Sequence, residues 1–319
     1  MRESTFVSRN KARWEEFEKT ITRQQQVSPD RLAELFIQVT DDLSLARTQF
    51  PNSRTTQYLN SLAGKIHREI YKNKKEEKNR FLLFWKLELP TVMFHSRKHL
   101  LYAFCLFTVA AVIGAVSVAH DDTFVRLVLG DAYVNMTLEN IKGGNPTQVY
   151  SGGGELDMFF GITLNNIMVS LRVFVFGVFF SLGTGLFLFY NALMVGTFMM
   201  FFYQQNQLSQ ALPVIMLHGT IELSSIVIAA AAGFVMGNSL LFPGTYSRLA
   251  SFKKGAVNGL KIVMGLVPFF ILAGFIESFI TRYAFMHWSI KATIIGLSAA
   301  LMIFYFILYP LQLKRHGRI

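Results

Sequence analysis

The stretch LLYAFCLFTVAAVIGAVSVA, residues 100–119, contains no charged side chain and decides the class of fold. A helix of this length spans about 30 Å, which matches the hydrocarbon core of a bilayer. The whole chain is 52% hydrophobic and 16% charged, whereas average soluble domains are about 25% charged. This composition excludes a soluble enzyme. Further apolar stretches follow at 161–182, 186–203, 211–236, 262–281 and 292–309. The sequence therefore predicts an all-α, polytopic integral membrane protein with six transmembrane helices.

The number of spans depends on residues 161–203, which are too many for one crossing. Gly183-Thr184-Gly185 lies near the middle of this stretch. We expect a tight turn there, because glycine adopts backbone conformations that other residues avoid. A single long, tilted helix is the alternative, and it would leave five spans.

The charges predict the orientation in the membrane. Residues 1–99 hold 19 basic and 12 acidic side chains, a net charge of +7. The connection 120–157 has six acidic and two basic side chains, whereas 237–259 and the tail QLKRHGRI have basic charges and no acidic ones. Cytoplasmic loops are enriched in Lys and Arg, so both termini are predicted to be cytoplasmic and 120–157 extracytoplasmic.

The formal net charge of +11 does not indicate a nucleic-acid-binding protein. The basic residues of the head are mixed with acidic ones, and no nucleic-acid-binding motif is present. A basic bias on the cytoplasmic side of a lipid bilayer explains the charge, so the bilayer is the expected partner.

The pattern of residues divides the chain into three regions. Residues 1–80 are predicted to be a cytoplasmic helical domain, with Trp14, Phe17 and Ile21 at helical spacing. Residues 81–99 mix apolar and basic side chains and are predicted to form an interfacial amphipathic helix. Residues 100–319 form the transmembrane domain, which includes the connection 120–157.

Four charged or titratable side chains lie well inside the predicted spans: Arg172, His218, Glu222 and Glu277. A charge there costs at least about 2.5–3.5 kcal/mol on insertion scales, so each needs a partner or a function. His218 and Glu222 are four residues apart and therefore share a helix face. From the predicted depths we expect one buried cluster, in which Arg172 pairs with Glu222 and His218 pairs with Glu277.

Four interpretations of this cluster remain open. Paired polar groups can fix which helices touch, and titrating Glu and His can conduct protons or ions. His218, Glu222 and Glu277 are weak candidates for a divalent metal site, because the second histidine of His-Glu-x-x-His is missing. Catalysis on a lipid or peptide is the fourth, but the chain has no Gly-x-Ser-x-Gly element. We therefore predict no catalytic residue, no cofactor and no metal.

Residues 218–237, HGTIELSSIVIAAAAGFVMG, and residues 190–198, YNALMVGTF, resemble the stage II sporulation protein M family of bacterial integral membrane proteins. The most distinctive element is His-Gly-x-x-Glu with its tail of small residues. By this match His218, Gly219 and Glu222 carry over as the family motif, together with Asn191 and Gly196. The head resembles longer members of the family at 6–21, 41–51 and 58–71.

The resemblance implies a protein of the bacterial inner membrane without established enzymatic activity. In spore formers the family member works with cell-wall hydrolases during engulfment. The long form is often encoded beside a MoxR-type ATPase and other membrane proteins. We therefore expect a non-enzymatic protein that organises or regulates an envelope assembly, with other membrane proteins and a MoxR-type ATPase system as partners.

Two further hypotheses follow from the residues. The small residues at 229–237 favour close helix packing and support a homodimer. The main alternative function is an ion- or proton-coupled transporter or channel that uses the four buried groups Arg172, His218, Glu222 and Glu277.

Overall fold

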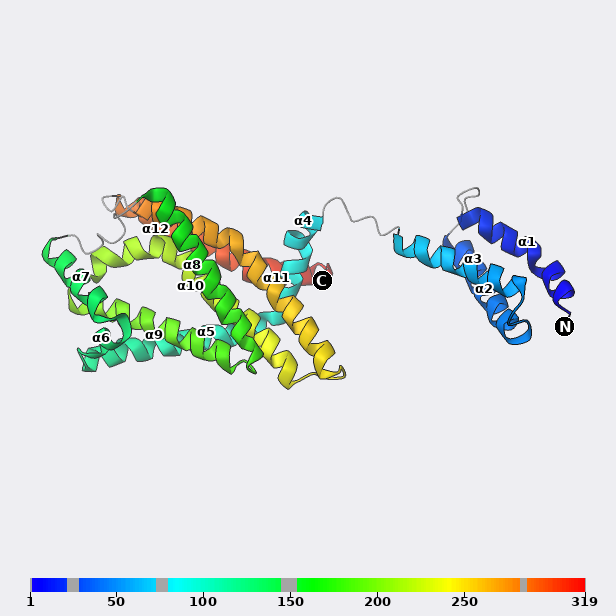
Figure 1. The fold of residues 1–319 in the computed structure, drawn as a ribbon. Helices are drawn as coiled ribbons and strands as arrows, with labels where there is room; N and C mark the ends of the chain where they lie inside the picture. Colours follow the sequence, from blue (N-terminus) through cyan, green and yellow to red (C-terminus); the bar gives the residue numbers. More distant parts are fainter. Residues whose placement is uncertain (1, 22–28, 73–79, 145–153, 282–285, 319) are drawn as a thin grey trace. The chain divides into compact units, whose positions relative to one another are not determined.

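The structure, a computed structural model, describes residues 2–21, 29–72, 80–144, 154–281 and 286–318. The described residues form helices and no strands, which confirms the predicted all-α class. The chain divides into two compact units, Met1–Arg80 and Phe81–Ile319, and Figure 1 shows the helices of each.

The first unit contains α1 (Glu3–Ile21), α2 (Pro29–Gln49) and α3 (Arg54–Lys72), packed around their own apolar core. Trp14 and Phe17 of α1 are buried in this core. The indole Nε1 of Trp14 donates to Asp42 Oδ2 at 2.8 Å, and Arg13 pairs with the same carboxylate oxygen at 2.6 Å. Asp42 of α2 therefore fixes the position of α1 through two side chains.

A second polar contact connects α1 to α3. Tyr58 Oη donates to Glu18 Oε2 at 2.9 Å, and Lys65 Nζ donates to Glu18 Oε1 at 3.2 Å. The bond from Tyr58, followed by that from Lys65, lowers the pKa of the Glu18 carboxyl. A carboxyl whose pKa is lower in the folded than in the unfolded chain stabilises the fold. This stabilisation is fully present above the pKa of the unfolded chain and is lost as the pH falls through the pKa of the folded chain.

We predict that Tyr58→Phe destabilises the first unit by about 1 kcal/mol at neutral pH and weakens its loss of stability in acid. Hydrogen exchange of α1 and α3 in the full chain, measured at pH 7 and at pH 4, tests this. Ser61→Ala is the control, because the Ser61 hydroxyl is exposed and bonds within its own helix. Equal exchange in Tyr58→Phe and wild type at both pH values would contradict the prediction.

The second unit contains the membrane-spanning helices. Its first part comprises α4 (Arg80–Leu83), η1 (Phe84–Glu88), α5 (Leu89–His120), α6 (Phe124–Leu129), α7 (Asp131–Lys142), α8 (Glu155–Val175) and η3 (Phe176–Val178). Its second part comprises α9 (Leu182–Gln204), α10 (Leu208–Leu241), α11 (Arg248–Phe275), η4 (Ile276–Thr281), α12 (Trp288–Ile303), η5 (Phe304–Leu308) and α13 (Tyr309–Arg315).

Six of the described helical segments are long and apolar enough to cross a membrane. They are Arg97–His120, Glu155–Val178, Leu182–Gln204, Leu208–Leu241, Arg248–Thr281 and Trp288–Arg315. This confirms the six-span prediction and removes the five-span alternative.

The turn that separates the second and third spans lies earlier than predicted. It is formed by residues 179–181, where Phe180 and Ser181 have φ of 53° and 69°, and α9 already begins at Leu182. Gly183 is therefore inside a helix, where a Cβ would collide with the carbonyl oxygen of Phe176. The glycine serves the close approach of two helices and not the turn itself.

The central helix of this unit is α10. In its apolar window 67% of the residues are buried, against 22% for Arg97–His120. Ala229–Ala232 are fully buried, and a Cβ on Gly233 would collide with the side chain of Thr184. These small residues thus pack inside the chain, so they are not available for the dimer that the sequence suggested.

The α5–α9 pair is held by very close backbone contact. A Cβ on Gly196 would collide with the backbone of Ala111, and a Cβ on Gly114 would collide with the carbonyl of Leu193. Small residues are what allow such approach in membranes, where helix packing and not water drives association. The first span is therefore paired with the third.

Residues 81–99 continue into the first span without interruption by a loop. Leu89 and Met93 belong to the main core of the unit, and Lys261 of α11 pairs with Glu88 at 2.6 Å. Tyr305 Oη donates to the carbonyl of Trp85 at 2.8 Å. The segment is thus packed against α11 and η5, and its location in the headgroup layer stays a prediction.

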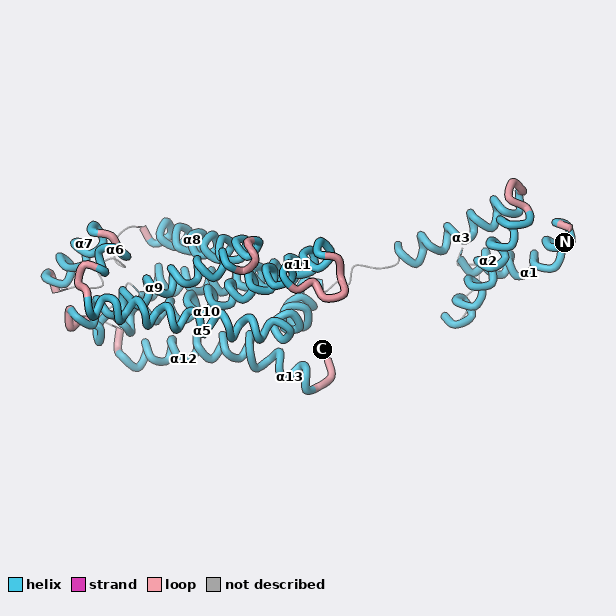
Figure 2. The backbone as a smooth tube through the Cα atoms, turned by 90° about the horizontal axis from the view of Figure 1, so that it is seen from below, coloured by secondary structure: helices cyan, strands magenta, loops and turns pink. Residues whose placement is uncertain are grey.

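The two ends of the second unit differ in charge. Both views place α6 and α7 at one end, and the α10–α11 turn and the C-terminus at the other (Figure 1; Figure 2). The acidic connection 120–157 contains α6 and α7, whereas Lys314 and Arg315 lie at the opposite end. This segregation agrees with the charge pattern of membrane proteins in which basic residues face the cytoplasm.

Candidate functional site

Helix α10 supplies two side chains of a polar cluster inside the second unit. His218 is 4% exposed, and Glu222 is half-buried one turn later on the same face. Ser225, fully buried, continues this stripe by a further three residues. A polar stripe on the most enclosed helix is costly unless its groups find partners.

The π-helical turn η4, which continues α11, supplies Glu277 and Thr281. Thr281 Oγ1 donates to the carbonyl of Ile276 at 3.1 Å, and it also lies 3.2 Å from His218 Nδ1. His218 Nε2 lies 3.8 Å from Glu277 Oε1. Single π-helical turns occur frequently at functional sites. Here the turn brings two of its side chains against one imidazole.

Helix α8 completes the cluster. Asn166 Nδ2 donates a short hydrogen bond to Glu222 Oε1. One ligand atom from each of His218, Glu222 and Glu277 lies within 4.8 Å of the other two. We call these three residues the His-Glu-Glu cluster. Three helices that are distant in the sequence thus converge on it.

Arg172 does not join the cluster. Its side chain is exposed on α8, and it forms no hydrogen bond or ion pair with any described residue. Asn166 and Arg172 are six residues apart, which places them about 120° apart around the helix. The predicted Arg172–Glu222 pair is therefore replaced by Asn166–Glu222. The long Arg172 side chain can instead extend to the headgroup region.

The remaining residues of the family motif have other roles. Asn191 Nδ2 donates to the carbonyl of Phe187 at 2.8 Å, within its own helix. Gly196 provides the α5–α9 contact. Gly219 is not required for close helix approach, since a Cβ there would meet Met216 and Ile215 at ordinary distances of 3.6 and 3.8 Å.

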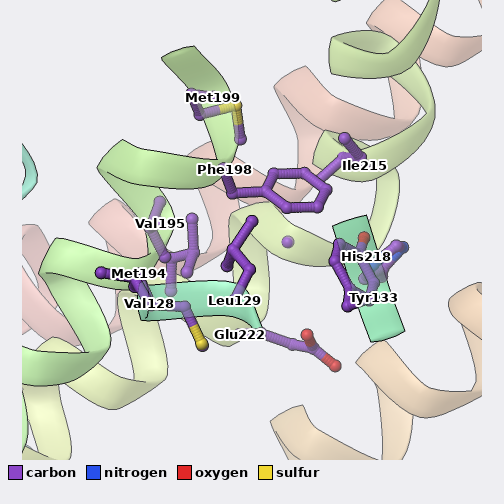
Figure 3. A pocket seen from close by; sticks show the side chains of 12 residues that line it. Val128, Leu129, Tyr133, Met194, Val195, Phe198, Met199, Ile215, His218 and Glu222 are labelled. Atoms are coloured by element: carbon purple, nitrogen blue, oxygen red, sulfur yellow. The ribbon is translucent and has the colours of Figure 1, made fainter. Parts of the chain in front are cut away.

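A cavity of about 340 Å³ borders the cluster. His218, Gly219 and Glu222 form part of its wall, and the rest is mostly apolar side chains of α6, α7, α9 and α10. In Figure 3 His218 and Tyr133 lie on the opposite side of the pocket from Met194 and Val128. Burial raises the pKa of the Tyr133 phenol, so Tyr133 stays neutral at the cavity wall. Gly219, next to His218 in the sequence, contributes no side chain to this wall.

The chemistry of the cluster follows from its charges. Among the described residues, no Lys or Arg pairs with Glu222 or Glu277. Two neighbouring carboxylates in a low-dielectric interior must be neutralised, either by protonation or by a bound cation. The arrangement can therefore hold protons or bind a cation, with the imidazole as a nitrogen ligand.

Two members of the site have no role that the sequence alone assigns. Asn166 is one of several polar residues in the spans, and its partner lies 56 residues away. Thr281 lies four residues after Glu277, a spacing that places both on one helix face. The spacing between Glu277 and Thr281 could therefore have identified Thr281 from the sequence. The contact between Asn166 and Glu222 can be seen only in the tertiary structure.

The fold and the buried cluster define an all-helical, polytopic membrane protein. The family model described as Stage II sporulation protein M matches residues 103–282, which is more than half of the chain. The chain belongs to this family. A model described as Domain of unknown function (DUF8413) matches residues 4–72, which cover the helices of the first unit. Comparisons with curated proteins and with solved structures found no match.

Proposed function

We propose that this protein is a non-enzymatic organiser of an envelope assembly in the bacterial inner membrane. The observation that carries the proposal is the combination of two separately packed units in one chain. The first has its own core of α1, α2 and α3, and the second has six helices able to span a membrane. Such a chain can bind partners in two different environments.

The charge distribution supports a cytoplasmic location of the first unit. The basic end of the second unit carries Lys314 and Arg315, and residues 1–99 have a net charge of +7. By the positive-inside rule both termini face the cytoplasm, and α6 and α7 face the outside. The first unit then meets cytoplasmic partners, of which a MoxR-type ATPase is our specific proposal, and the second unit meets other membrane proteins.

A homodimer, if it is part of this assembly, requires a surface other than residues 229–237. Helix α5 exposes several large apolar side chains, among them Leu101, Phe104 and Val112. Such a surface is covered either by lipid or by another membrane helix. We propose lipid-exposed faces of this kind as the dimer contact.

The test compares the full chain with a chain that lacks residues 1–80. We expect the shortened chain to insert normally and to keep its membrane partners, but to lose co-purification of the MoxR-type ATPase of the same organism. Retention of the ATPase by the shortened chain would contradict the assignment of the first unit.

Glu222→Gln separates the organiser from a transporter. If this variant assembles normally but abolishes a proton or ion flux that the wild type shows in proteoliposomes, transport is the function. The transport alternative assumed that four groups, including the positively charged Arg172, lie together. Arg172 is exposed and outside the cluster, which weakens this alternative.

A further inference from the structure

We propose that the His-Glu-Glu cluster binds one divalent first-row transition-metal ion, of the zinc or manganese type, inside the membrane unit. His218, Glu222 and Glu277 are the ligands, and Asn166 and Thr281 position them. The inference goes beyond the organising role, which does not require a metal.

The charge balance of the cluster is the first argument. Two carboxylates, one neutral imidazole and one divalent cation sum to zero net charge. A neutral set is what a low-dielectric interior favours, because uncompensated buried charges are strongly destabilising. Within the described chain neither carboxylate is compensated by a Lys or Arg.

The hydrogen bonds assign the histidine tautomer. Thr281 has one hydroxyl hydrogen, and it donates this hydrogen to the carbonyl of Ile276. Thr281 Oγ1 then accepts from His218 Nδ1–H, and in this tautomer His218 Nε2, which lies 3.8 Å from Glu277 Oε1, is the ring nitrogen that can bind a metal. A ring N–H fixed by an outer partner is the usual arrangement for a metal-binding histidine.

The distances fit a shared ion better than a direct contact. Nε2 and Oε1 of Glu277 are 3.8 Å apart, which is too far for a hydrogen bond. Zinc binds nitrogen and carboxylate oxygen at about 2.0–2.2 Å, so two tetrahedral ligand atoms are about 3.4 Å apart. The three ligand atoms lie within 4.8 Å of one another, so the most distant pair must approach by up to about 1.4 Å to surround one ion.

Buried hydroxyls next to the cluster point the same way. Ser225 Oγ is buried without a hydrogen-bond partner, on the face of α10 that carries His218 and Glu222. Thr163 Oγ1 is likewise unpartnered, three residues from Asn166 on α8, and it lies against Gly274 of α11. Buried polar atoms without partners are rare, and a bound ion or water is one of the explanations for them.

The ligand chemistry selects the class of metal. An imidazole nitrogen with two carboxylates suits zinc, manganese or iron, whereas calcium and magnesium prefer oxygen ligands alone. The cavity of about 340 Å³ reaches His218 and Glu222, so it supplies the entry path and room for a further ligand.

The experiment uses the full-length protein without a polyhistidine tag, stripped with a chelator and dialysed against Zn²⁺. Elemental analysis should find about one zinc per chain. His218→Gln and Glu277→Gln should reduce this to background, whereas the matched exposed changes His120→Gln and Glu139→Gln should leave it unchanged. A hundredfold excess of Mg²⁺ should not displace the zinc.

Thr281→Val keeps all three ligands and should weaken zinc binding by about 10–100-fold, the effect typical of an outer-shell partner. Size-exclusion chromatography shows whether the ligand variants fold. If they do not, Thr281→Val still tests the proposal. No zinc above background in correctly folded wild type would overturn the proposal and leave protons as the neutralising charges. Displacement by Mg²⁺ would overturn the assigned class of metal.

Discussion

Gly196→Leu is expected to prevent stable assembly of the membrane unit. A side chain at this position would collide with backbone atoms of Ala111 in α5, and a backbone cannot move aside as a flexible side chain can. Helices α5 and α9 would have to separate along their contact. Overpacking of this kind costs about 1–3 kcal/mol in soluble cores, and the rigid neighbour here places the expected loss at about 3 kcal/mol or more. Thermal unfolding and protein level in membranes measure it.

Two other glycines provide matched controls for this prediction. Gly161 and Gly296 also lie inside membrane-spanning helices, but no atom lies within 4 Å of a Cβ built on either. Leucine at these positions should be tolerated. If Gly196→Leu and Gly296→Leu unfold at the same temperature, this result would contradict the close contact between α5 and α9.

Phe17→Ala is expected to unfold the first unit and to leave the second intact. Phe17 is fully buried, and removing a large aromatic side chain from a core typically costs about 3–5 kcal/mol. Domains have about 0.05–0.15 kcal/mol of stability per residue, so a unit of 80 residues has about 4–12 kcal/mol and this loss removes a large part of it. Limited proteolysis of the full chain should then digest residues 1–80 and spare the membrane helices.

Ile37→Ala is the control for Phe17→Ala. Ile37 is 59% exposed on α2, so its truncation removes little buried area and should leave the digestion pattern unchanged. Loss of the membrane helices together with the first unit in Phe17→Ala would contradict the division of the chain into two units.

The sequence predicted well how deep each residue lies along its helix. It predicted poorly the side of the helix on which each side chain lies. Hydropathy located the six spans, because an uncharged apolar run of about 20 residues is typical of a membrane-spanning helix. The same argument placed Arg172 at the depth of Glu222. It could not show that Arg172 projects away from the cluster while Asn166 faces it.

The glycine-rich sequence led to a wrong position for the turn between the second and third spans. Gly183 and Gly185 suggested a turn, but the positive φ values fall on Phe180 and Ser181. Tertiary contact accounts for the difference, since Gly183 is needed where α9 passes η3. Contacts between helices distant in sequence decide such positions, and a single sequence does not display them.

The pairing of α5 with α9 sets an order of events during synthesis. The first span ends at His120, and the third ends only at Gln204. At translation rates of about 5–20 residues per second, the partner of α5 is complete roughly 4–17 s later. During that interval the glycine-bearing face of α5 has no partner from its own chain. The insertion machinery or surrounding lipid must cover it until the third span arrives.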